Sequence, residues 1–174
     1  MQAFAEFVDK YSRYVFNLAY RVLKDHQDAE EAAQDTFVKV FHALDDYRGD
    51  GKVTTWLYTI TYRNCLNRMR SNRLHVVEVE DQVREGKADS TYVSGLESLE
   101  RADRSELIRR GMEQLSSKES AVLTLFYLEE QSLKEISEIM GLTSSNAKVI
   151  LHRGRKNLYH ILRSQQEEPL TEWI

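Results

Sequence analysis

The stretch TTWLYTITYRNCLNRMR, residues 54–70, predicts one long helix with two separate apolar stripes. At about 100° per residue, the first stripe lies on one face and consists of Tyr58, Tyr62, Cys65, Leu66 and Met69. The second stripe lies on nearly the opposite face and consists of Val53, Trp56, Leu57 and Ile60. The apolar surface therefore changes sides halfway along a helix that we expect to span residues 53–73.

Polar side chains continue the second stripe beyond Ile60. They are Arg63, Asn64, Asn67 and Ser71, with Arg70 at the edge. Flat rings, amides and guanidinium groups together suit single-stranded bases, which stack on aromatic side chains and expose edges that pairing normally hides. The alternative is a helix that is buried on both sides in its first half and solvated in its second half. The helix alone leaves both interpretations open.

The segments before this helix predict two further helices and a loop. Apolar residues recur at helical spacing over residues 2–24 and 27–44, and the expected inward positions of the second segment are Ala29, Ala33, Phe37, Val40, Phe41 and Leu44. The opposite face of that segment is acidic around one apolar residue and carries Asp28, Glu31, Asp35, Val38 and His42. In the loop YRGDGK, residues 47–52, two glycines permit positive φ and a close approach of the backbone.

The helical period is lost over residues 74–95. This acidic segment contains Gly86 and Gly95 and predicts a flexible linker, although VVEVE, residues 76–80, is alternatively a short strand. We therefore expect an all-α protein with two small helical domains, residues 1–73 and 97–164. The acidic linker covers residues 74–96, and residues 165–174 form a tail.

Two capping boxes mark helix starts in the second half. Ser116 with Glu119, and Ser132 with Glu135, both fit the pattern S-x-x-E, in which each side chain bonds the backbone N–H of the other residue. With these start signals, we expect helices over residues 97–114, 117–129, 132–140 and 144–164.

The stretch SLKEISEIMGLTSSNAKVILHRGRKNL, residues 132–158, has the pattern of a helix-turn-helix. Gly141 lies where the turn needs a left-handed residue, Ser137 is small enough for close helix crossing, and Ala147 faces the first helix. The second helix of such a motif enters the major groove of DNA. The outward residues expected to contact DNA are Thr143, Ser144, Ser145, Lys148, Val149, His152, Arg153, Arg155 and Lys156. The alternative is an ordinary helical hairpin with a solvated basic face.

Charge is arranged in blocks, although the net charge is −4. Residues 25–46 hold seven acids and one lysine, whereas residues 47–73 hold six basic side chains and one acid. Residues 76–106 hold nine acids against four bases, and residues 132–164 hold six bases against two acids. Two basic blocks separated by an acidic connector indicate two surfaces for a polyanion.

Cysteine content and hydropathy indicate a cytoplasmic protein. The single cysteine excludes an internal disulfide and cannot by itself build a thiolate metal site, which favours a reducing compartment. No run of about 18 apolar residues predicts a membrane span.

Two parts of the chain resemble the extracytoplasmic-function (ECF) sigma factors. Residues 14–73 are similar to region 2, because D-A-E-(D/E)-x-x-Q-(D/E)-x-F, then (F/Y)-R-G, then T-W-L-Y-x-I and a basic tail occur in order and spacing. Residues 105–164 are similar to region 4, through LKEISEIMGLT and LHRGRKNL. Ser145, Asn146 and Ile150 depart from the pattern in region 4 and Arg63 departs in region 2, so base preference is not transferred.

The resemblance implies a dissociable, non-catalytic subunit that gives bacterial RNA polymerase its promoter choice and helps to open DNA. The positions that match the docking face for the clamp helices of the largest subunit are Glu31, Gln34 and Asp35, with Asp28 and Val38 adjacent. The loop of residues 47–52 matches the family's specificity loop for the single-stranded −10 element. The candidates at this loop and its rim are Tyr47, Arg48, Asp50, Lys52 and Trp56, and the strand's path would be lined by Arg63, Asn64, Asn67 and Arg70. The second domain would read the −35 element as duplex, and an anti-sigma factor is an expected partner.

Two other functions fit parts of the sequence. A stand-alone helix-turn-helix regulator has a similar C-terminal half, but it needs neither the acidic face nor the aromatic helix. An enzyme is disfavoured because the five histidines form no H-x-x-x-H pair, and His42 with Asp46 is a weak two-ligand pattern. We therefore expect no catalytic residue, no metal and no cofactor.

Overall fold

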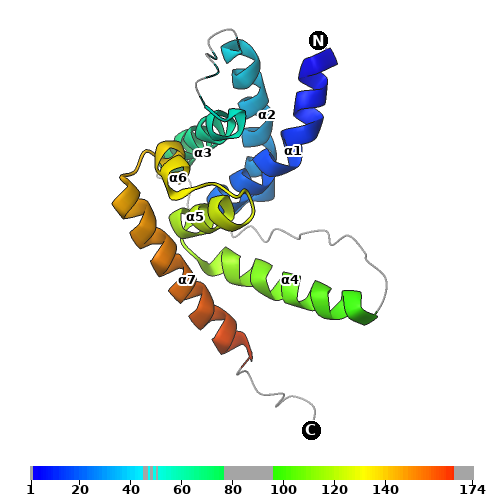
Figure 1. Cartoon of the computed structure of the whole chain (residues 1–174), viewed down its shortest axis with the longest axis vertical. Helices are drawn as coiled ribbons and strands as arrows, with labels where there is room; N and C mark the ends of the chain where they lie inside the picture. Colours follow the sequence, from blue (N-terminus) through cyan, green and yellow to red (C-terminus); the bar gives the residue numbers. More distant parts are fainter. Residues whose placement is uncertain (1, 45–46, 48, 50, 77–95, 167–174) are drawn as a thin grey trace.

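The computed structural model describes residues 2–44, 47, 49, 51–76 and 96–166. They form the helices α1 (Gln2–Leu23), α2 (His26–Ala43), α3 (Val53–Val76), α4 (Leu96–Gln114), α5 (Ser117–Tyr127), α6 (Leu133–Met140) and α7 (Ser144–Gln166), shown in Figure 1. Over these residues the structure has no strand, which confirms the all-α class. Most of the predicted linker and tail, including residues 77–80 of VVEVE, lies outside the described residues.

The first three helices pack against one another. The chain leaves α1 through Lys24, whose φ of 62° is left-handed, and α2 then begins with Asp25 as its N-cap. The Asp25 carboxylate accepts a hydrogen bond from the Asp28 amide at 2.8 Å, which satisfies one of the free N–H groups at the helix start. Asp25 and Lys24 thus set the corner between α1 and α2.

The two apolar stripes of α3 enter two different apolar clusters, which confirms the predicted change of side. Leu57 is fully buried with Val15, Ala33 and Val40 in the smaller cluster, against which Trp56 also packs. Tyr58, Tyr62 and Cys65 belong to the larger cluster on the other side of the helix. Because α3 is covered on both faces, it is the central helix of the first half.

Both predicted capping boxes are present in the second half. Ser116 and Glu119 start α5, and Ser132 and Glu135 start α6. Gly141 ends α6 in the left-handed conformation, with φ 64° and ψ 39°, as the turn of a helix-turn-helix requires. The helices α4 and α7 approach closely at Gly111, where an added Cβ would lie 2.9 Å from the Leu158 side chain.

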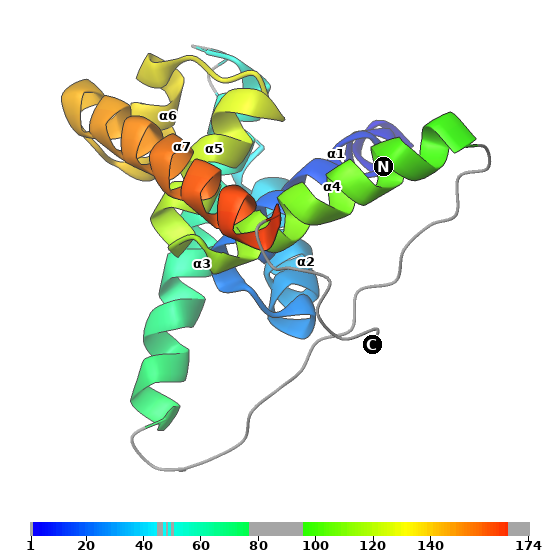
Figure 2. The ribbon, with the colours of Figure 1, turned by 90° about the horizontal axis from the view of Figure 1, so that it is seen from below.

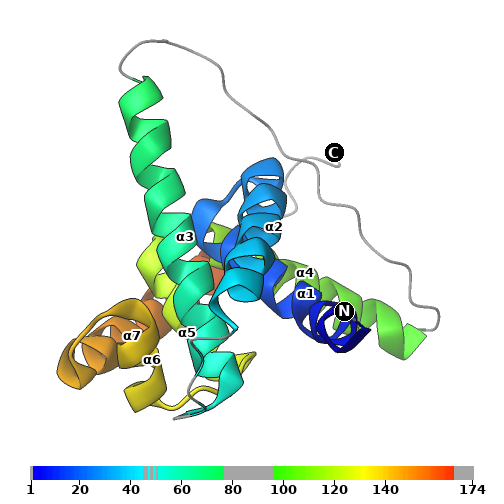
Figure 3. The ribbon, with the colours of Figure 1, turned by 90° about the horizontal axis from the view of Figure 1, so that it is seen from above.

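The two halves of the chain share the larger apolar cluster. Buried residues of α1, α2 and α3 meet buried residues of α4, α5, α6 and α7 in it. The helices α3 and α6 are in contact, and so are α1 and α5. Figure 3 shows α6 beside the first part of α3, and Figure 2 shows the end of α7 against α4. Each half has its own helices, as the sequence predicts, but the folded chain joins them through one apolar seam.

Two residues of α2 differ from the expected inward set. Phe41 is 52% exposed and Leu44, which follows α2, is 39% exposed, whereas Ala29 and Val40 are fully buried. Phe41 makes an edge contact with Phe4, with ring centroids 5.1 Å apart. The prediction of burial at Phe41 and Leu44 was wrong: near the end of α2 the Phe41 ring packs against Phe4 but about half of it remains exposed.

A lysine bonds the end of α4 across the seam. The Lys24 ammonium donates to the backbone carbonyls of Met112 at 3.0 Å, Glu113 at 2.6 Å and Leu115 at 2.6 Å. Carbonyls at a helix C-terminus have no partner within the helix, and a cation there also offsets the negative end of the helix dipole. Lys24 thus joins the corner after α1 to the end of α4.

We expect Lys24→Met to lower the free energy of unfolding by about 1–3 kcal/mol, because it leaves three carbonyls without their donor. Thermal or urea denaturation followed by circular dichroism measures the change. Lys134→Met, at an exposed position on α6, is the matched control and should have little effect. Equal stability of the two variants would contradict the role of Lys24.

Candidate nucleic-acid interface

An aromatic pair lies at the start of α3. The rings of Tyr47 and Trp56 have centroids 4.8 Å apart at an interplanar angle of 36°. The Tyr47 hydroxyl also donates to the Gly51 carbonyl at 2.7 Å, which holds the loop against the helix. Lys52 follows with a side chain that is 64% exposed. Arg48 and Asp50, which the sequence predicts for the same loop, lie outside the described residues.

The polar strip beyond Trp56 is exposed at all of its predicted positions except Asn64. Arg63, Asn67 and Arg70 are exposed, but Asn64 is only 7% exposed. The Asn64 amide donates to the Ala32 carbonyl at 3.0 Å and accepts from the Lys39 ammonium. The expectation that Asn64 faces a DNA strand is therefore corrected: its side chain faces α2 and joins the two helices.

The acidic face of α2 is partly neutralised by α3. Arg68 donates to Asp28 at 2.9 Å and also pairs with Glu31, while the Asn72 amide donates to Asp28 at 2.9 Å. The hydrogen bond from Arg68 lowers the pKa of the Glu31 carboxyl. Sequence analysis missed Arg68, although it follows the inward Asn64 by four residues and so shares its face toward α2.

The remaining part of this face consists of Asp35, Gln34 and Val38. Asp35 and Gln34 are exposed, and Val38 is 56% exposed. Among the described residues, the Asp35 carboxylate has no hydrogen bond or ion pair. These three side chains form an uncompensated acidic and apolar surface beside the Arg68 pairs.

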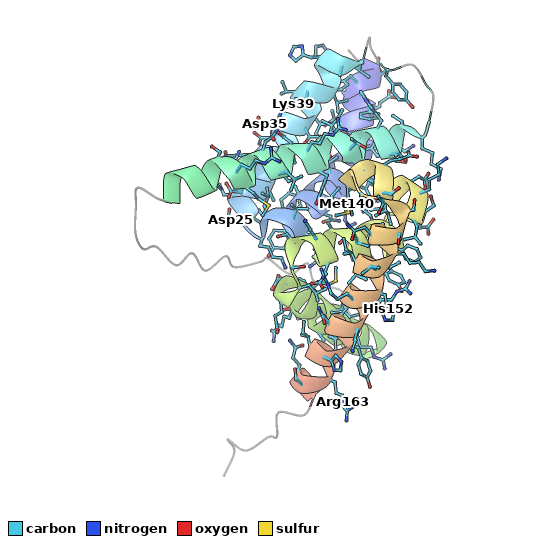
Figure 4. All side chains as sticks on the ribbon, turned by 90° about the vertical axis from the view of Figure 1, so that its left-hand side faces the viewer. Asp25, Asp35, Lys39, Met140, His152 and Arg163 are labelled. Atoms are coloured by element: carbon cyan, nitrogen blue, oxygen red, sulfur yellow. The ribbon has the colours of Figure 1, made fainter. Side chains whose placement is uncertain are left out.

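A polar cleft joins this face to the strip on α3. It has a volume of about 450 Å³ and is lined by Ala32, Asp35, Asn64, Asn67, Arg68, Ser71 and Asn72. In Figure 4, Asp35 and Lys39 on α2 lie beside α3, whereas His152 lies on α7 at the far side of α6. The acidic face of α2 and the polar strip of α3 therefore both line this cleft.

All nine residues predicted for duplex recognition are exposed on α7 or just before it. The Thr143 hydroxyl accepts a hydrogen bond from the backbone N–H of Asn146 at 3.2 Å, so Thr143 caps the start of α7. The buried residues Ala147, Ile150 and Leu151 hold the other face of the helix against the core. The helix therefore presents one continuous polar face to the outside.

Two of the arginines on α7 are held near their own domain. Arg153 donates to Glu119 at 2.7 Å, and the Arg155 guanidinium lies 5.3 Å from the centroids of both Phe126 and Tyr127. The ion pair with Arg153 and the bond from Ser116 lower the pKa of the Glu119 carboxyl against the opposing effect of burial. These contacts orient both guanidinium groups at the edge of the exposed face.

Both halves of the chain match models of known protein families. The family model described as Sigma-70 region 2 matches residues 7–75, and the one described as Sigma-70, region 4 matches residues 105–158. The RNA polymerase sigma factor YlaC of Bacillus subtilis (strain 168) is 32% identical over 160 residues, which cover 91% of each chain. The chain belongs to the ECF sigma factors. The ECF RNA polymerase sigma factor SigW of the same organism is 29% identical to this ECF sigma factor. The match covers 92% of this chain and 89% of SigW.

Solved structures agree with this sigma factor fold. The sigma factor RpoE from Bartonella quintana, in complex with the anti-sigma factor NepR, has a TM-score of 0.78 and 20% identity. The match covers 94% of this chain and 98% of RpoE. CnrH, in complex with the cytosolic domain of CnrY, has a TM-score of 0.60 and 23% identity over 94% of this chain and 89% of CnrH. The family resemblance seen in the sequence is confirmed, and a stand-alone regulator is not favoured.

In the part of the chain that the structure describes, no three histidine, cysteine, aspartate or glutamate side chains come close enough together to hold a metal ion. None of the helices there combines the length and the apolar character needed to cross a bilayer.

Asn64 and Asn67 should respond differently to truncation. We expect Asn64→Ala to lower the free energy of unfolding by about 1–3 kcal/mol, because the Ala32 carbonyl and Lys39 lose a buried partner. Asn67→Ala, at an exposed position three residues further along α3, is the control and should change stability by less than about 0.5 kcal/mol. Urea denaturation decides between them, and a small effect at both positions would contradict the structural role of Asn64.

Proposed function

We propose that this ECF sigma factor divides promoter recognition between its two halves. The first half would bind core RNA polymerase and read the −10 element as a single strand, and the second half would read the −35 element as duplex. The observation that carries the proposal is the exposure of Arg63, Asn67 and Arg70 beyond the half-buried Trp56 on α3 and of the outward face of α7, within matches to regions 2 and 4 in the family order. The proposal is tested by adding the chain to core RNA polymerase and measuring whether transcription then starts at specific promoters.

Polymerase docking is proposed at the acidic face of α2, on the clamp helices of the largest subunit. Val38 supplies an apolar centre, Asp35 and Gln34 supply the free polar rim, and Arg68 fixes the carboxylates of Asp28 and Glu31. Charge complementarity steers encounter, and a small desolvated centre then slows dissociation. The face thus suits a basic coiled coil, with Asp35 as the residue whose charge is least compensated.

Strand reading is proposed at the loop and strip of α3. The separated strand would enter at Tyr47, Lys52 and Trp56 and continue over Arg63, Asn67 and Arg70. Two further contacts, Arg48 and Asp50, are proposed from the sequence. Unstacking a base requires a few kcal/mol, which stacking of about 1–3 kcal/mol per base and phosphate contacts can offset. The half-buried Tyr47 and Trp56 rings and the exposed guanidinium groups therefore favour the separated strand over the duplex.

Duplex reading is proposed for the outward face of α7. Thr143, Ser144 and Ser145 lie at the end of the helix that would meet base edges, while Lys148, Val149 and His152 lie one and two turns further. Arg153, Arg155 and Lys156 are proposed phosphate contacts. Val149 is 58% exposed and so is available to a thymine methyl group.

The proposed partners and setting follow from the family. Sigma factors are non-catalytic initiation factors, so we propose that the chain is not an enzyme and needs no cofactor or metal of its own. We further propose that it acts in the bacterial cytoplasm, at the nucleoid when bound to polymerase. An anti-sigma factor is a proposed inhibitor, because two structures of similar fold are complexes with such partners.

Asp35→Lys should weaken binding to core RNA polymerase by about tenfold or more, which corresponds to about 1.4 kcal/mol or more. The physical reason is that a repulsive charge replaces Asp35, the acid of this face for which the described residues offer no ion-pair partner. The binding affinity is measured by fluorescence anisotropy with labelled protein. Glu30→Lys, with the same charge change on another face of α2, is the control, and equal losses would contradict the docking face.

Trp56→Ala should slow promoter opening by about tenfold while closed-complex affinity changes little, because the ring would contact only separated bases. The loss corresponds to about 1–3 kcal/mol of stacking. Permanganate reactivity of unpaired thymines measures opening, and a mobility-shift assay measures closed binding. An equal loss in both steps would remove Trp56 from the strand path.

A further inference from the structure

A buried carboxylate joins the start of α5 to the middle of α7. Glu119 is 5% exposed, and its two oxygens bond different helices. Oε2 accepts from the backbone N–H of Ser116 at 3.2 Å and from the Ser116 hydroxyl at 2.6 Å, as part of the capping box of α5. Oε1 accepts from Nε of Arg153 at 2.7 Å and from the side-chain amide of Asn157 at 3.0 Å. The cap of α5 is thus bonded directly to the helix that carries the outward polar face.

Gly154 lets α7 approach α5 closely at this carboxylate. A Cβ added to Gly154 would lie 3.4 Å from the Cβ of Glu119 and 3.4 Å from the Leu123 side chain. Arg153 and Asn157 are four residues apart on α7 and so share one side of the helix. Because the gap between the helices is short, both side chains reach the same oxygen of Glu119.

The Glu119 carboxyl is ionised at neutral pH although it is buried. Burial opposes the charge, but the hydrogen bonds from Ser116 and Arg153 outweigh that effect and lower the pKa of the carboxyl. A buried carboxylate requires such partners, and a hydrogen bond between two charged groups is stronger than one between neutral groups. Glu119 therefore holds Arg153 as a charged acceptor.

The bond to Glu119 uses the inner nitrogen of the Arg153 guanidinium and leaves the outer nitrogens available. The Arg153 side chain is 57% exposed. Among the described residues, its Nη1 and Nη2 groups have no hydrogen-bond partner. Arg153 lies one turn beyond the outward residue Val149, and its two outer groups form a planar fork that matches the oxygens of a phosphate. Glu119 thus fixes the guanidinium from the inside of the domain while its outer edge faces solvent.

Arg155 is held without a carboxylate. Its guanidinium lies 5.3 Å from the ring centroids of Phe126 and Tyr127, near the end of α5. A ring face attracts a cation through its quadrupole and needs no hydrogen bond to do so. Arg155 is therefore a neighbouring arginine on the same helix whose contacts do not involve Glu119.

Glu119 has two opposite effects on the binding of a phosphate by Arg153. A side chain that is fixed before binding avoids the cost of being ordered on the DNA, which is about two- to tenfold in affinity for one long side chain. The charge of Glu119 acts against binding, because a carboxylate repels a phosphate. Loss of the carboxylate therefore weakens binding if the anchor dominates and strengthens binding if the charge dominates.

We propose that Glu119 is a positioning residue for DNA recognition by the second half, because it anchors Nε of Arg153 so that Nη1 and Nη2 face a DNA phosphate before the DNA binds. Glu119 itself stays buried and acts only through Arg153. This role rests on the proposed duplex reading by α7, in which Arg153 is a phosphate contact.

Nuclear magnetic resonance of the free full-length chain tests the anchor. We expect the Nε–Hε group of Arg153 to be rigid on the picosecond-to-nanosecond timescale and to become mobile in Glu119→Gln. A glutamine keeps the capping box with its oxygen but turns an NH2 group, which cannot accept, toward Arg153. The Arg155 signal is the internal control and should not change. Equal mobility of Arg153 in the two proteins would overturn the proposal.

Affinity for duplex DNA tests what the anchor does. The probe is a labelled duplex of about 30 base pairs and mixed sequence, because phosphate contacts carry no sequence information. Fluorescence anisotropy at low salt should show Glu119→Gln binding about two- to tenfold more weakly than the wild type. Glu138→Gln, the same charge change at an exposed position of α6, is the control and should bind at least as tightly as the wild type. Unchanged or tighter binding by Glu119→Gln would overturn the proposal.

An Arg153→Ala background separates positioning from a general structural role. If Glu119 acts through Arg153, Glu119→Gln should cause no further loss of affinity in this background. Arg153→Gln, which keeps a donor for the carboxylate, is a second background with the same expectation. A further loss in both backgrounds would overturn the positioning role.

Arg153→Ala alone tests the contact on which this role rests. We expect it to weaken duplex binding and to lower the salt dependence by about one phosphate contact. Binding as tight as that of the wild type would overturn the phosphate contact of the proposed function, and the positioning role with it. The mobility of Arg153 in the free chain would still show whether Glu119 anchors the guanidinium, so the two failures are distinguishable.

Discussion

Burial of α3 on two opposite sides is the constraint on which the rest of the structure depends. Leu57 needs the cover that α1 and α2 provide, whereas Tyr58 and Tyr62 need cover from the second half of the chain. A helix with apolar residues on both faces has no stable place at the surface of a small domain, because one face would remain in water. The seam between the halves answers this requirement, and the exposed strip begins only where the second stripe becomes polar.

Much of this architecture could be predicted from local sequence. The helical periods, both capping boxes and the left-handed Gly141 depend on residues within one turn of each other, so they follow from spacing alone. Phe41 could not be predicted correctly, because its exposure depends on where neighbouring helices end. The burial of Asn64 could not be predicted from local sequence either. Its neighbours Arg63 and Asn67 face solvent, but α2 crosses α3 at Asn64, and the Asn64 amide donates a hydrogen bond to a carbonyl of α2.

Arg68 and Lys24 show what kind of residue sequence reasoning overlooks. Each is a single charged side chain within a basic or mixed segment, and each acts on another helix, through Asp28 and Glu31 in one case and through the end of α4 in the other. Their value comes from satisfying polar groups that the fold has already placed. The candidate binding surfaces therefore stand on internal polar contacts that leave no periodic mark in the sequence.

The burial of Cys65 bears on how such a factor can respond to oxidants. Its side chain is fully buried and burial raises the pKa of the thiol to about 12, so the reactive thiolate is essentially unpopulated at neutral pH. The chain has no second cysteine with which an internal disulfide could form. In the folded chain Cys65 is therefore a poor target for peroxide or for disulfide exchange, and it acts as a small core residue.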